Sequence, residues 1–256
     1  MDRVSKMIAE VAERLRGELR ITVFTGAGMS AASGVPTFRG SGGLWEGHRI
    51  EDVATPQAFE RDPELVWRFY DARRQNLLKC CPNEGHVVLA KWSKRYPKFV
   101  VLTQNVDGLH EAAGTGNVTR LHGSLWDFAC AEGCAKSPRR WRNTEVPLAK
   151  IPPRCPHCGG MARPDIVWFG EALDSENWTA AAGATRCDVF FAMGTSAVVQ
   201  PAASLISMAM GQGAFTVEIN PDQTPATSAV DAALGLPVEV ALRKIEEEIS
   251  CAVRRP

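Results

Sequence analysis

Short, apolar, β-branched runs alternate along this chain with stretches that have helical patterns, and this alternation leaves few folds open to it. Five runs have the length and composition of buried parallel strands: Ile21–Thr25, Phe99–Thr103, Ile166–Phe169, Val189–Met193 and Phe215–Ile219. Helices are predicted over Pro201–Met210 and Val240–Ile249, and apolar spacings of three and four predict an amphipathic helix within the first twenty residues. This alternation favours an α/β fold with a doubly wound parallel sheet.

Two segments break the alternation. The segment from Trp45 to about Cys81 has a helical pattern with several aromatic side chains, whereas Cys130 to Arg163 is rich in Pro, Gly, Arg and Cys without periodicity. Such a stretch rarely packs by itself and needs a cross-link, such as a bound metal ion, to hold it together. We therefore expect a Rossmann-like domain made of residues 1–44, 82–129 and 164–256, with an inserted helical and zinc-binding lobe made of residues 45–81 and 130–163.

Composition excludes some partners. Lys and Arg total 29, as do Asp and Glu, so the formal net charge of zero gives no global reason to expect binding to nucleic acid or to a charged membrane surface. The N-terminus has no continuous apolar stretch of a secretory signal, and no run of about 18 apolar residues occurs. We expect a soluble, cytoplasmic protein.

Four of the eight cysteines form two closely spaced pairs. Cys130 and Cys134 are followed, after 20 intervening residues, by Cys155 and Cys158. In a reducing compartment this spacing predicts a closed tetrahedral zinc site, which leaves no open position for water and is therefore structural. His157 lies between two of these ligands but is not needed to complete the tetrahedron. The other four cysteines are expected to be buried small apolar residues: Cys80, Cys81, Cys187 and Cys251.

Polar turns follow three of the predicted strands. Ile21–Thr25 runs into Gly26-Ala27-Gly28-Met29-Ser30-Ala31, a G-x-G-x-x-A turn that lets a backbone approach a pyrophosphate. Gln104-Asn105-Val106-Asp107 and Gly194-Thr195-Ser196 follow two further strands. Ligands bind at the carboxyl ends of strands in open α/β sheets, so these turns predict a nucleotide crevice. No acidic residue ends a second strand about 20 residues after the glycines, which disfavours a dehydrogenase.

These motifs together resemble those of the sirtuin family. The ordered set also includes Gly34-Val35-Pro36-Thr37-Phe38-Arg39, His122-Gly123 and the four paired cysteines, and it extends from about Ile21 to Asn220. The resemblance implies a Rossmann-like domain, a small zinc-and-helix lobe, and a cleft in which NAD and an acyl-lysine peptide meet.

The resemblance also implies roles for individual residues. NAD would be contacted by Gly26, Ala27, Gly28, Phe38, Arg39, Gln104, Asn105, Asp107, Gly194, Thr195, Ser196 and Asn220. The substrate peptide would pair with Val167, Trp168 and Phe169 by strand addition. Members of the family often have Glu where this chain has Ala32, a change from which we expect little because the position lies within the helix.

The implied reaction transfers the acyl group to ADP-ribose. Nicotinamide leaves as the acyl oxygen attacks the ribose, and His122 then takes a proton from a ribose hydroxyl. Imidazole suits this role because its ordinary pKa is about 6.5. The products are nicotinamide, acylated ADP-ribose and free lysine, so NAD is consumed. We expect His48, His86 and His110 to be structural.

A pair of residues in the helical segment bears on the acyl group. Tyr70 and Arg73 are three apart and share a helical face, where a phenol beside a guanidinium fork suits a carboxylate. With small Ala54, the pair resembles class III sirtuins, which remove succinyl and malonyl groups and often keep deacetylase activity. Arg74 points about 100° away around the helix. The alternative is an amphipathic helix that buries Tyr70 and exposes Arg73.

Two other functions are compatible with the crevice. An NAD-dependent ADP-ribosyltransferase would leave label from NAD on a protein, whereas deacylation would release acyl-ADP-ribose. A non-catalytic NAD-sensing module would need no base, so His122 and the Gln104–Asp107 segment argue against it. The sequence leaves the substrate proteins and the oligomeric state open.

Overall fold

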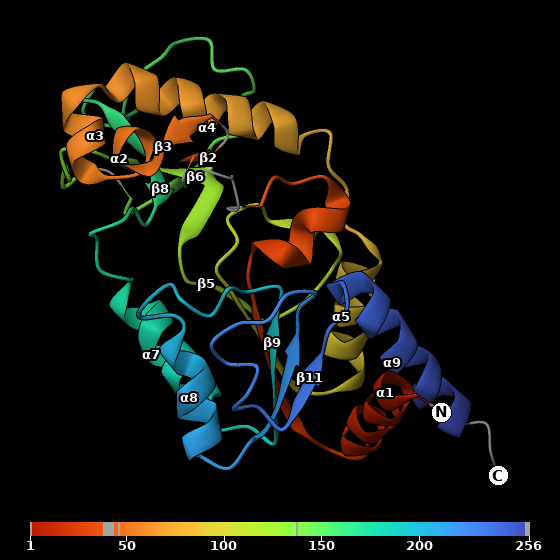
Figure 1. Ribbon diagram of the computed structural model, residues 1–256. Helices are drawn as coiled ribbons and strands as arrows, with labels where there is room; N and C mark the ends of the chain where they lie inside the picture. The colour runs from red at the N-terminus through yellow and green to blue at the C-terminus, as the bar shows by residue number, and fades with distance from the viewer. Residues whose placement is uncertain (1, 38–43, 46, 137, 254–256) are drawn as a thin grey trace.

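The computed structural model describes residues 2–37, 44–45, 47–136 and 138–253. Its largest sheet has six parallel strands in the order β11-β10-β9-β1-β4-β5 (Figure 1). The strands are β1 (Arg20–Thr25), β4 (Lys98–Thr103), β5 (Val118–Arg120), β9 (Val189–Met193), β10 (Phe215–Ile219) and β11 (Ala232–Leu234). The predicted doubly wound parallel sheet is confirmed.

β1 lies at the centre of this sheet. Its residues from Ile21 to Thr25 are all buried, as expected for a parallel strand covered on both faces. Thr25 aligns with Thr103 of β4 on one side and with Met193 of β9 on the other. The carboxyl ends of the three strands therefore lie side by side at the topological switch point, because β4 and β5 lie on one side of β1 and β9, β10 and β11 lie on the other. Open sheets of this kind bind ligands at the switch point.

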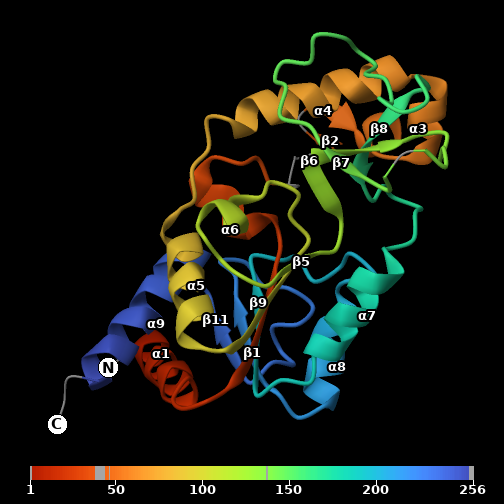
Figure 2. The same ribbon diagram turned by 180° about the vertical axis from the view of Figure 1, so that it is seen from behind.

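Helices cover both faces of the sheet (Figures 1 and 2). α1 (Arg3–Arg14), α5 (Glu84–Arg95) and α9 (Val238–Val253) pack on one face, and α7 (Ser175–Ala184) and α8 (Ser204–Gly211) pack on the other. Apolar residues at helical spacing, such as Ile8, Trp92 and Leu242, form the core between the first group and the sheet. The short α6 (Leu109–Ala112) follows the β4 turn.

A smaller lobe packs beside the carboxyl edge of the sheet. It contains β2 (Leu44–Trp45), β3 (His48–Arg49), α2 (Ile50–Val53), α3 (Pro56–Arg61), α4 (Pro63–Leu77), and an antiparallel sheet of β7 (Trp141–Arg142), β6 (Gly123–Cys130) and β8 (Ala162–Ile166). α4 inserts the fully buried Trp67 against Phe128, with ring centroids 4.6 Å apart. The exact boundaries of the two lobes in the sequence stay a prediction.

One predicted strand is wrong. The run Ile166–Phe169 is not a parallel strand of the main sheet, since β8 ends at Ile166 and pairs antiparallel with β6. The run is apolar because Trp168 is buried among side chains of the smaller lobe, with the Phe59 ring 5.2 Å away. Strands β5 and β11 were not predicted because each is only three residues long.

The expectation for the four unpaired cysteines is also partly wrong. Cys187 is buried, but Cys81 and Cys251 are exposed and Cys80 is half-buried. Cys251 lies in the last turn of the amphipathic helix α9, which ends beyond the core. Among the described residues, no helix is both long enough and apolar enough to cross a membrane.

Candidate active site

One cavity of about 770 Å³ collects the predicted NAD and substrate residues. Its lining includes Gly26, Ala27, Gly28, Ala54, Tyr70, Arg73, Gln104, Asn105, Asp107, His122, Val167, Trp168, Phe169, Gly194, Thr195, Ser196 and Asn220. Phe38 and Arg39 lie outside the described residues. Ala32 lies within the helical turn η1 (Ala27–Ser33), as expected, and it also borders the cavity.

Glycines bring the turns after β1 and β9 into direct backbone contact. A Cβ added to Gly28 would lie 2.7 Å from the Gly194 Cα, and one added to Gly26 would lie 2.8 Å from the Thr195 Cα. Gly194 itself has φ +57 and is closed in by Gly28 and Met29. The Gly28 amide donates to the Gly194 carbonyl at 2.8 Å. The turns after β1 and β9 therefore form one joined floor of the cavity.

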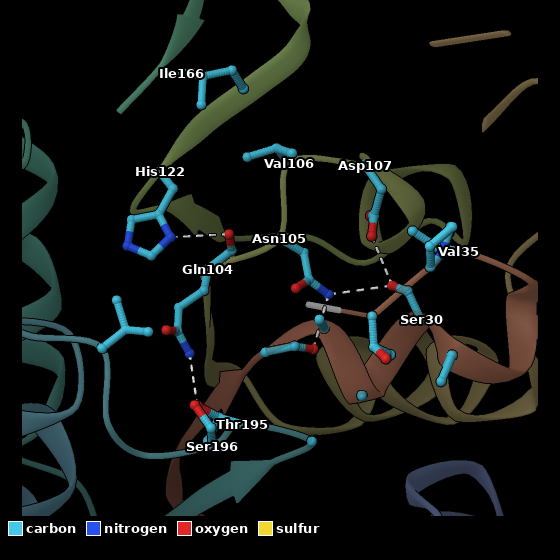
Figure 3. Close-up of a pocket in the computed structure, with 18 of the residues that line it drawn as sticks. Ser30, Val35, Gln104, Asn105, Val106, Asp107, His122, Ile166, Thr195 and Ser196 are labelled. Carbon is cyan, nitrogen blue, oxygen red and sulfur yellow. Dashed lines mark hydrogen bonds between the residues drawn. The ribbon is translucent and has the colours of Figure 1, made fainter. Parts of the chain in front are cut away.

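Amide side chains join the turns after β4, β9 and β10. Gln104 Nε2 donates to Thr195 Oγ1 at 2.9 Å (Figure 3). Asn220 Nδ2 donates to the Thr195 carbonyl at 2.8 Å. The predicted polar groups thus follow four neighbouring strands and hold one another in place. Such preorganised polar groups are what an extended polar ligand requires.

Asp107 and Asn105 form a second polar group beside η1. Ser30 Oγ donates to Asp107 Oδ2 at 2.7 Å, and Asn105 Nδ2 donates to the Gly26 carbonyl at 3.0 Å and to Ser30 Oγ at 3.2 Å (Figure 3). Burial raises the pKa of Asp107, whereas hydrogen bonds from Leu109 and Ser30 and the charge of Arg73 act to lower it. These contacts place an acidic side chain in the cavity wall.

His122 follows β5 and faces the cavity. Its Nδ1 lies 3.2 Å from the Gln104 carbonyl oxygen (Figure 3). A carbonyl only accepts, so Nδ1 donates in this contact and Nε2 keeps its lone pair. Burial lowers the pKa of His122, and the hydrogen bond to Gln104 acts in the opposite direction. The imidazole is therefore held as a neutral base.

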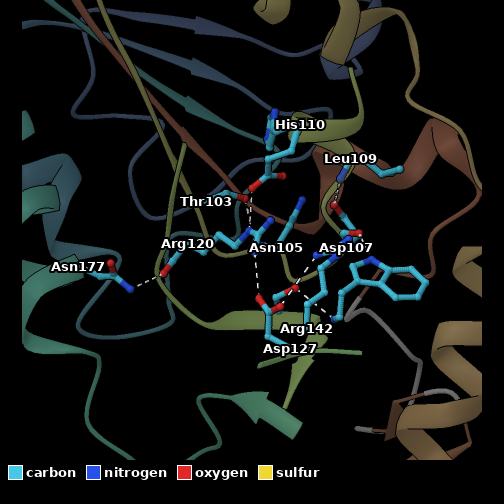
Figure 4. Close-up of polar contacts among 12 residues, drawn as sticks. Thr103, Asn105, Asp107, Leu109, His110, Arg120, Asp127, Arg142 and Asn177 are labelled. Carbon is cyan, nitrogen blue, oxygen red and sulfur yellow. Dashed lines mark hydrogen bonds and ion pairs between the residues drawn. The ribbon is translucent and has the colours of Figure 1, made fainter. Parts of the chain in front are cut away.

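A polar layer behind the cavity fixes the segment that carries His122 (Figure 4). Arg120 Nε contacts Glu111 at 2.7 Å, Arg120 Nη1 contacts Asp127 at 3.3 Å, and Asn177 Nδ2 donates to the Arg120 carbonyl at 3.1 Å. Arg120, two residues before His122, is thus held by three different elements, through its side chain to Glu111 and Asp127 and through its carbonyl to Asn177. His110 is part of the same layer, with Nε2 3.1 Å from Thr25 Oγ1.

His86 and His110 are buried away from the cavity, as expected of structural histidines. Burial lowers the pKa of His86 to about 4 and that of His110 to about 3, and their ring centroids lie 5.0 Å apart. Neither lines the cavity. Both stay neutral at neutral pH and pack between α5 and α6.

The four paired cysteines meet in one cluster in the smaller lobe. Their Sγ atoms all lie within 4.8 Å of one another, with Cys130–Cys158 at 3.7 Å and Cys134–Cys155 at 3.9 Å. Four thiolates at about 2.3 Å from a zinc ion would be about 3.8 Å apart, so the cluster fits this metal. The Gly160 amide, 3.3 Å from Cys158 Sγ, suits a thiolate there.

Tyr70, Arg73 and Ala54 lie together on the cavity wall formed by the smaller lobe. Arg73 is only 8% exposed, which contradicts the alternative that this helix exposes it. Tyr70 is 1% exposed, its Oη accepts from Trp168 Nε1 at 3.0 Å, and burial raises its pKa to about 12. Arg74 points elsewhere, as predicted, and Nη2 donates to the Asn143 carbonyl at 2.8 Å.

The segment predicted to pair with a peptide already uses its backbone amides. Val167 N donates to the His122 carbonyl at 3.0 Å, Trp168 N donates to Glu171 Oε2 at 2.9 Å, and Phe169 N donates to the Ala54 carbonyl at 3.0 Å. A complete ladder with a peptide would require these bonds to open. Strand addition at this segment stays a prediction.

No role was predicted for three residues that contact the predicted site residues. Ser30 was part of the glycine motif but was given no role, although it links Asp107 to Asn105. Arg163 and Glu171 form a two-pronged ion pair beside Trp168. No local pattern marks a pair eight residues apart across a turn, so only the folded chain identifies it.

Comparison with known proteins identifies the family. A model described as the Sir2 family matches residues 26–201. The chain belongs to the Sir2 family. The NAD-dependent protein deacylase 1 of Caldanaerobacter subterraneus subsp. tengcongensis is 50% identical over 83% of this chain and 87% of that protein. The NAD-dependent protein deacylase of Aquifex aeolicus is 46% identical over 89% of this chain and 94% of that protein.

Solved structures agree with this assignment to Sir2. A Sir2 homologue in complex with NAD superposes with a TM-score of 0.85 at 38% identity, covering 99% of this chain and 95% of that one. A Sir2 structure with a p53 peptide and NAD gives a TM-score of 0.82 at 29% identity, covering 94% and 98% of the two chains. The Sir2 fold, with its parallel sheet and four-cysteine cluster, extends over essentially the whole chain.

Proposed function

We propose that this Sir2 protein is an NAD-dependent protein deacylase whose preferred substrates carry succinyl or malonyl groups on lysine. NAD-dependent deacylation follows from membership of the family and from its similarity to relatives named for that activity. The preference for acidic acyl groups rests on the contacts of Tyr70 and Arg73. A cytoplasmic location and acyl-lysine proteins as partners stay predictions from the sequence.

The residues at the carboxyl ends of the strands suit NAD. The joined turns at Gly28 and Gly194 leave no room for a Cβ, so backbone forms the floor on which phosphates would lie. Thr195, Ser196 and Asn220 would bind phosphate and adenine ribose, and Gln104 and Asn105 would hold the nicotinamide ribose. Buried Asp107 would contribute to the carboxamide pocket. A cavity of about 770 Å³ is within the size range for extended ligands.

His122 would act as the general base. Its Nδ1 proton is engaged by the Gln104 carbonyl, so Nε2 is available to accept a proton from a ribose hydroxyl. Its lowered pKa keeps the ring neutral at neutral pH. NAD, when bound, supplies the ribose that receives the acyl group, and zinc in the four-cysteine cluster would hold the smaller lobe together without taking part in the reaction.

The proposed acyl preference is supported by the burial of the Arg73 guanidinium and the Tyr70 phenol in the same cavity as His122. Arg73 and Tyr70 come from one face of α4 and line the cavity with Ala54. The planar guanidinium fork of Arg73 matches the geometry of a carboxylate. A succinyl or malonyl group ends in such a carboxylate, and small Ala54 leaves space for the chain.

The test is mass spectrometry of one peptide carrying succinyl-, malonyl- or acetyl-lysine, with and without NAD. We expect NAD-dependent loss of all three groups, fastest for the acidic ones, together with acylated ADP-ribose. NAD-dependent removal of acetyl alone would refute the acyl preference. Radiolabel from NAD retained on the protein, without free acyl-ADP-ribose, would favour the ADP-ribosyltransferase.

A further inference from the structure

We propose that Arg163, Glu171 and Trp168 are positioning residues that set the direction of the Tyr70 hydroxyl, and thereby tune selection of the acyl group. This inference rests on the proposed preference for acidic acyl groups. The residues form a chain of contacts from the turn after β8 to the cavity wall on α4.

The first link is the ion pair. Arg163 Nη1 and Nη2 contact the two oxygens of Glu171 at 2.7 and 2.9 Å, and Nη2 also donates to the Ile166 carbonyl at 3.0 Å. Glu171 Oε2 additionally accepts from the Trp168 amide at 2.9 Å. A two-pronged pair of this kind fixes orientation as well as distance. The ion pair therefore ties β8 to the segment that follows it.

The second link is the stacking of Arg163 on Trp168. The guanidinium carbon lies 3.8 Å from the centroid of the indole ring, and the Phe59 ring centroid is 5.2 Å away. Trp168 is 3% exposed. With its backbone amide bound to Glu171 and its ring held by a cation and a phenyl group, the indole has one orientation.

The third link is the hydrogen bond between Trp168 and Tyr70, and it fixes which of the two groups donates. An indole N–H only donates, so in the 3.0 Å contact the Tyr70 oxygen must accept. The phenol proton is then left to donate to a group in the cavity, and accepting a bond makes it a better donor. An acyl carboxylate beside Arg73 is an acceptor of this kind, whereas an acetyl group does not reach as far or carry a charge. Trp168 thus favours acidic acyl groups through Tyr70.

The kinetic test compares Trp168→Phe with Trp92→Phe. Each change removes one indole N–H bond, but Trp92 donates to Glu246 at 2.9 Å on α9, away from the cavity. We expect Trp168→Phe to lower the ratio of succinyl to acetyl kcat/KM about 3- to 10-fold, the worth of one hydrogen bond, through the KM for the succinyl peptide. Trp92→Phe should leave the ratio unchanged.

A double-mutant cycle tests whether Trp168 acts through Tyr70. In a Tyr70→Phe background, Trp168→Phe should change the ratio by less than about 2-fold, because the oxygen that accepts its proton is gone. An undiminished effect in that background would overturn the proposal. Arg163→Lys, which keeps the charge near Glu171 but loses the planar fork, should lower the ratio in the same direction as Trp168→Phe.

A spectroscopic readout works without turnover. The chain has two tyrosines, so labelling tyrosine at 13Cζ gives two signals. Trp168→Phe should move the Tyr70 signal only, whereas Trp92→Phe should move that of Tyr96, whose ring centroid is 6.4 Å from Trp92. An unmoved Tyr70 signal would refute the contact. Absence of desuccinylation in the wild type, with the Tyr70 signal still moved, would instead refute the proposed function.

Discussion

Arg73→Met is the substitution that most directly tests the acyl preference. Methionine has a similar length and fills the 8% exposed site on the cavity wall, but it lacks the charge and the fork. A succinyl carboxylate would lose charge-assisted hydrogen bonds worth about 1.5–3 kcal/mol. At 1.36 kcal/mol for each factor of ten, kcat/KM for desuccinylation should fall roughly 10- to 150-fold. An acetyl group has no carboxylate, so deacetylation should change by less than about 3-fold.

A residual effect on both substrates is expected through Asp107. The charge of Arg73 acts to lower the pKa of that buried carboxyl, and methionine removes this influence. The effect is common to all acyl groups, so it changes both rates and not their ratio. The assay therefore measures kcat and KM for succinyl- and acetyl-lysine versions of one peptide at saturating NAD, with product peptide quantified by chromatography.

Arg74→Met is the matched control. Arg74 is the next residue on α4 and is fully buried, but it does not line the cavity, and Nη2 donates to both the carbonyl and Oδ1 of Asn143 at 2.8 Å. Its replacement should lower the melting temperature without changing the ratio of succinyl to acetyl kcat/KM. Equal loss of both activities in Arg73→Met, or an equal change of ratio in Arg74→Met, would refute recognition of the carboxylate by Arg73.

Three further predictions follow from the site and the core. His122→Tyr should abolish NAD-dependent turnover while zinc stays bound, and a mutant that still deacylates would remove His122 from the mechanism. In the wild type, kcat/KM should begin to fall on the acid side only below pH about 6.5, because the lowered pKa of His122 keeps the base neutral to lower pH. Cys155→Ser, or removal of zinc by a chelator, should lower the melting temperature because the staple of the smaller lobe is lost, and an unchanged melting temperature at verified loss of metal would contradict a structural role. His86 and His110 have folded pKa values of about 4 and about 3 against 6.5 in the unfolded chain, so the unfolded state gains protons first and stability falls as pH drops below about 6.5. Urea unfolding should show a loss of roughly 1 kcal/mol per histidine between pH 7 and 5.5, and His86→Gln should reduce that loss.

Local sequence patterns predicted the parts of the fold that depend on burial alone. A run such as Val189–Met193 must be covered on both faces, so its composition identified a parallel strand with the observed bounds. Short strands such as β5 are held by their neighbours and leave little trace in composition. The run Ile166–Phe169 was misassigned because burial inside a lobe and burial inside a sheet select the same apolar residues.

Local sequence patterns predicted the chemical groups of the site, because strand ends, glycine turns and paired cysteines each depend on a few neighbouring residues. The contacts among these groups follow from the folding of the whole chain. Asp107 meets Ser30 from 77 residues away, and Trp168 meets Tyr70 from 98 residues away. Such contacts depend on the packing of the two lobes, and the direction of a hydrogen bond depends on the orientation that this packing allows. No periodicity or spacing encodes that orientation, which is why the positioning of Tyr70 emerged only from the folded chain.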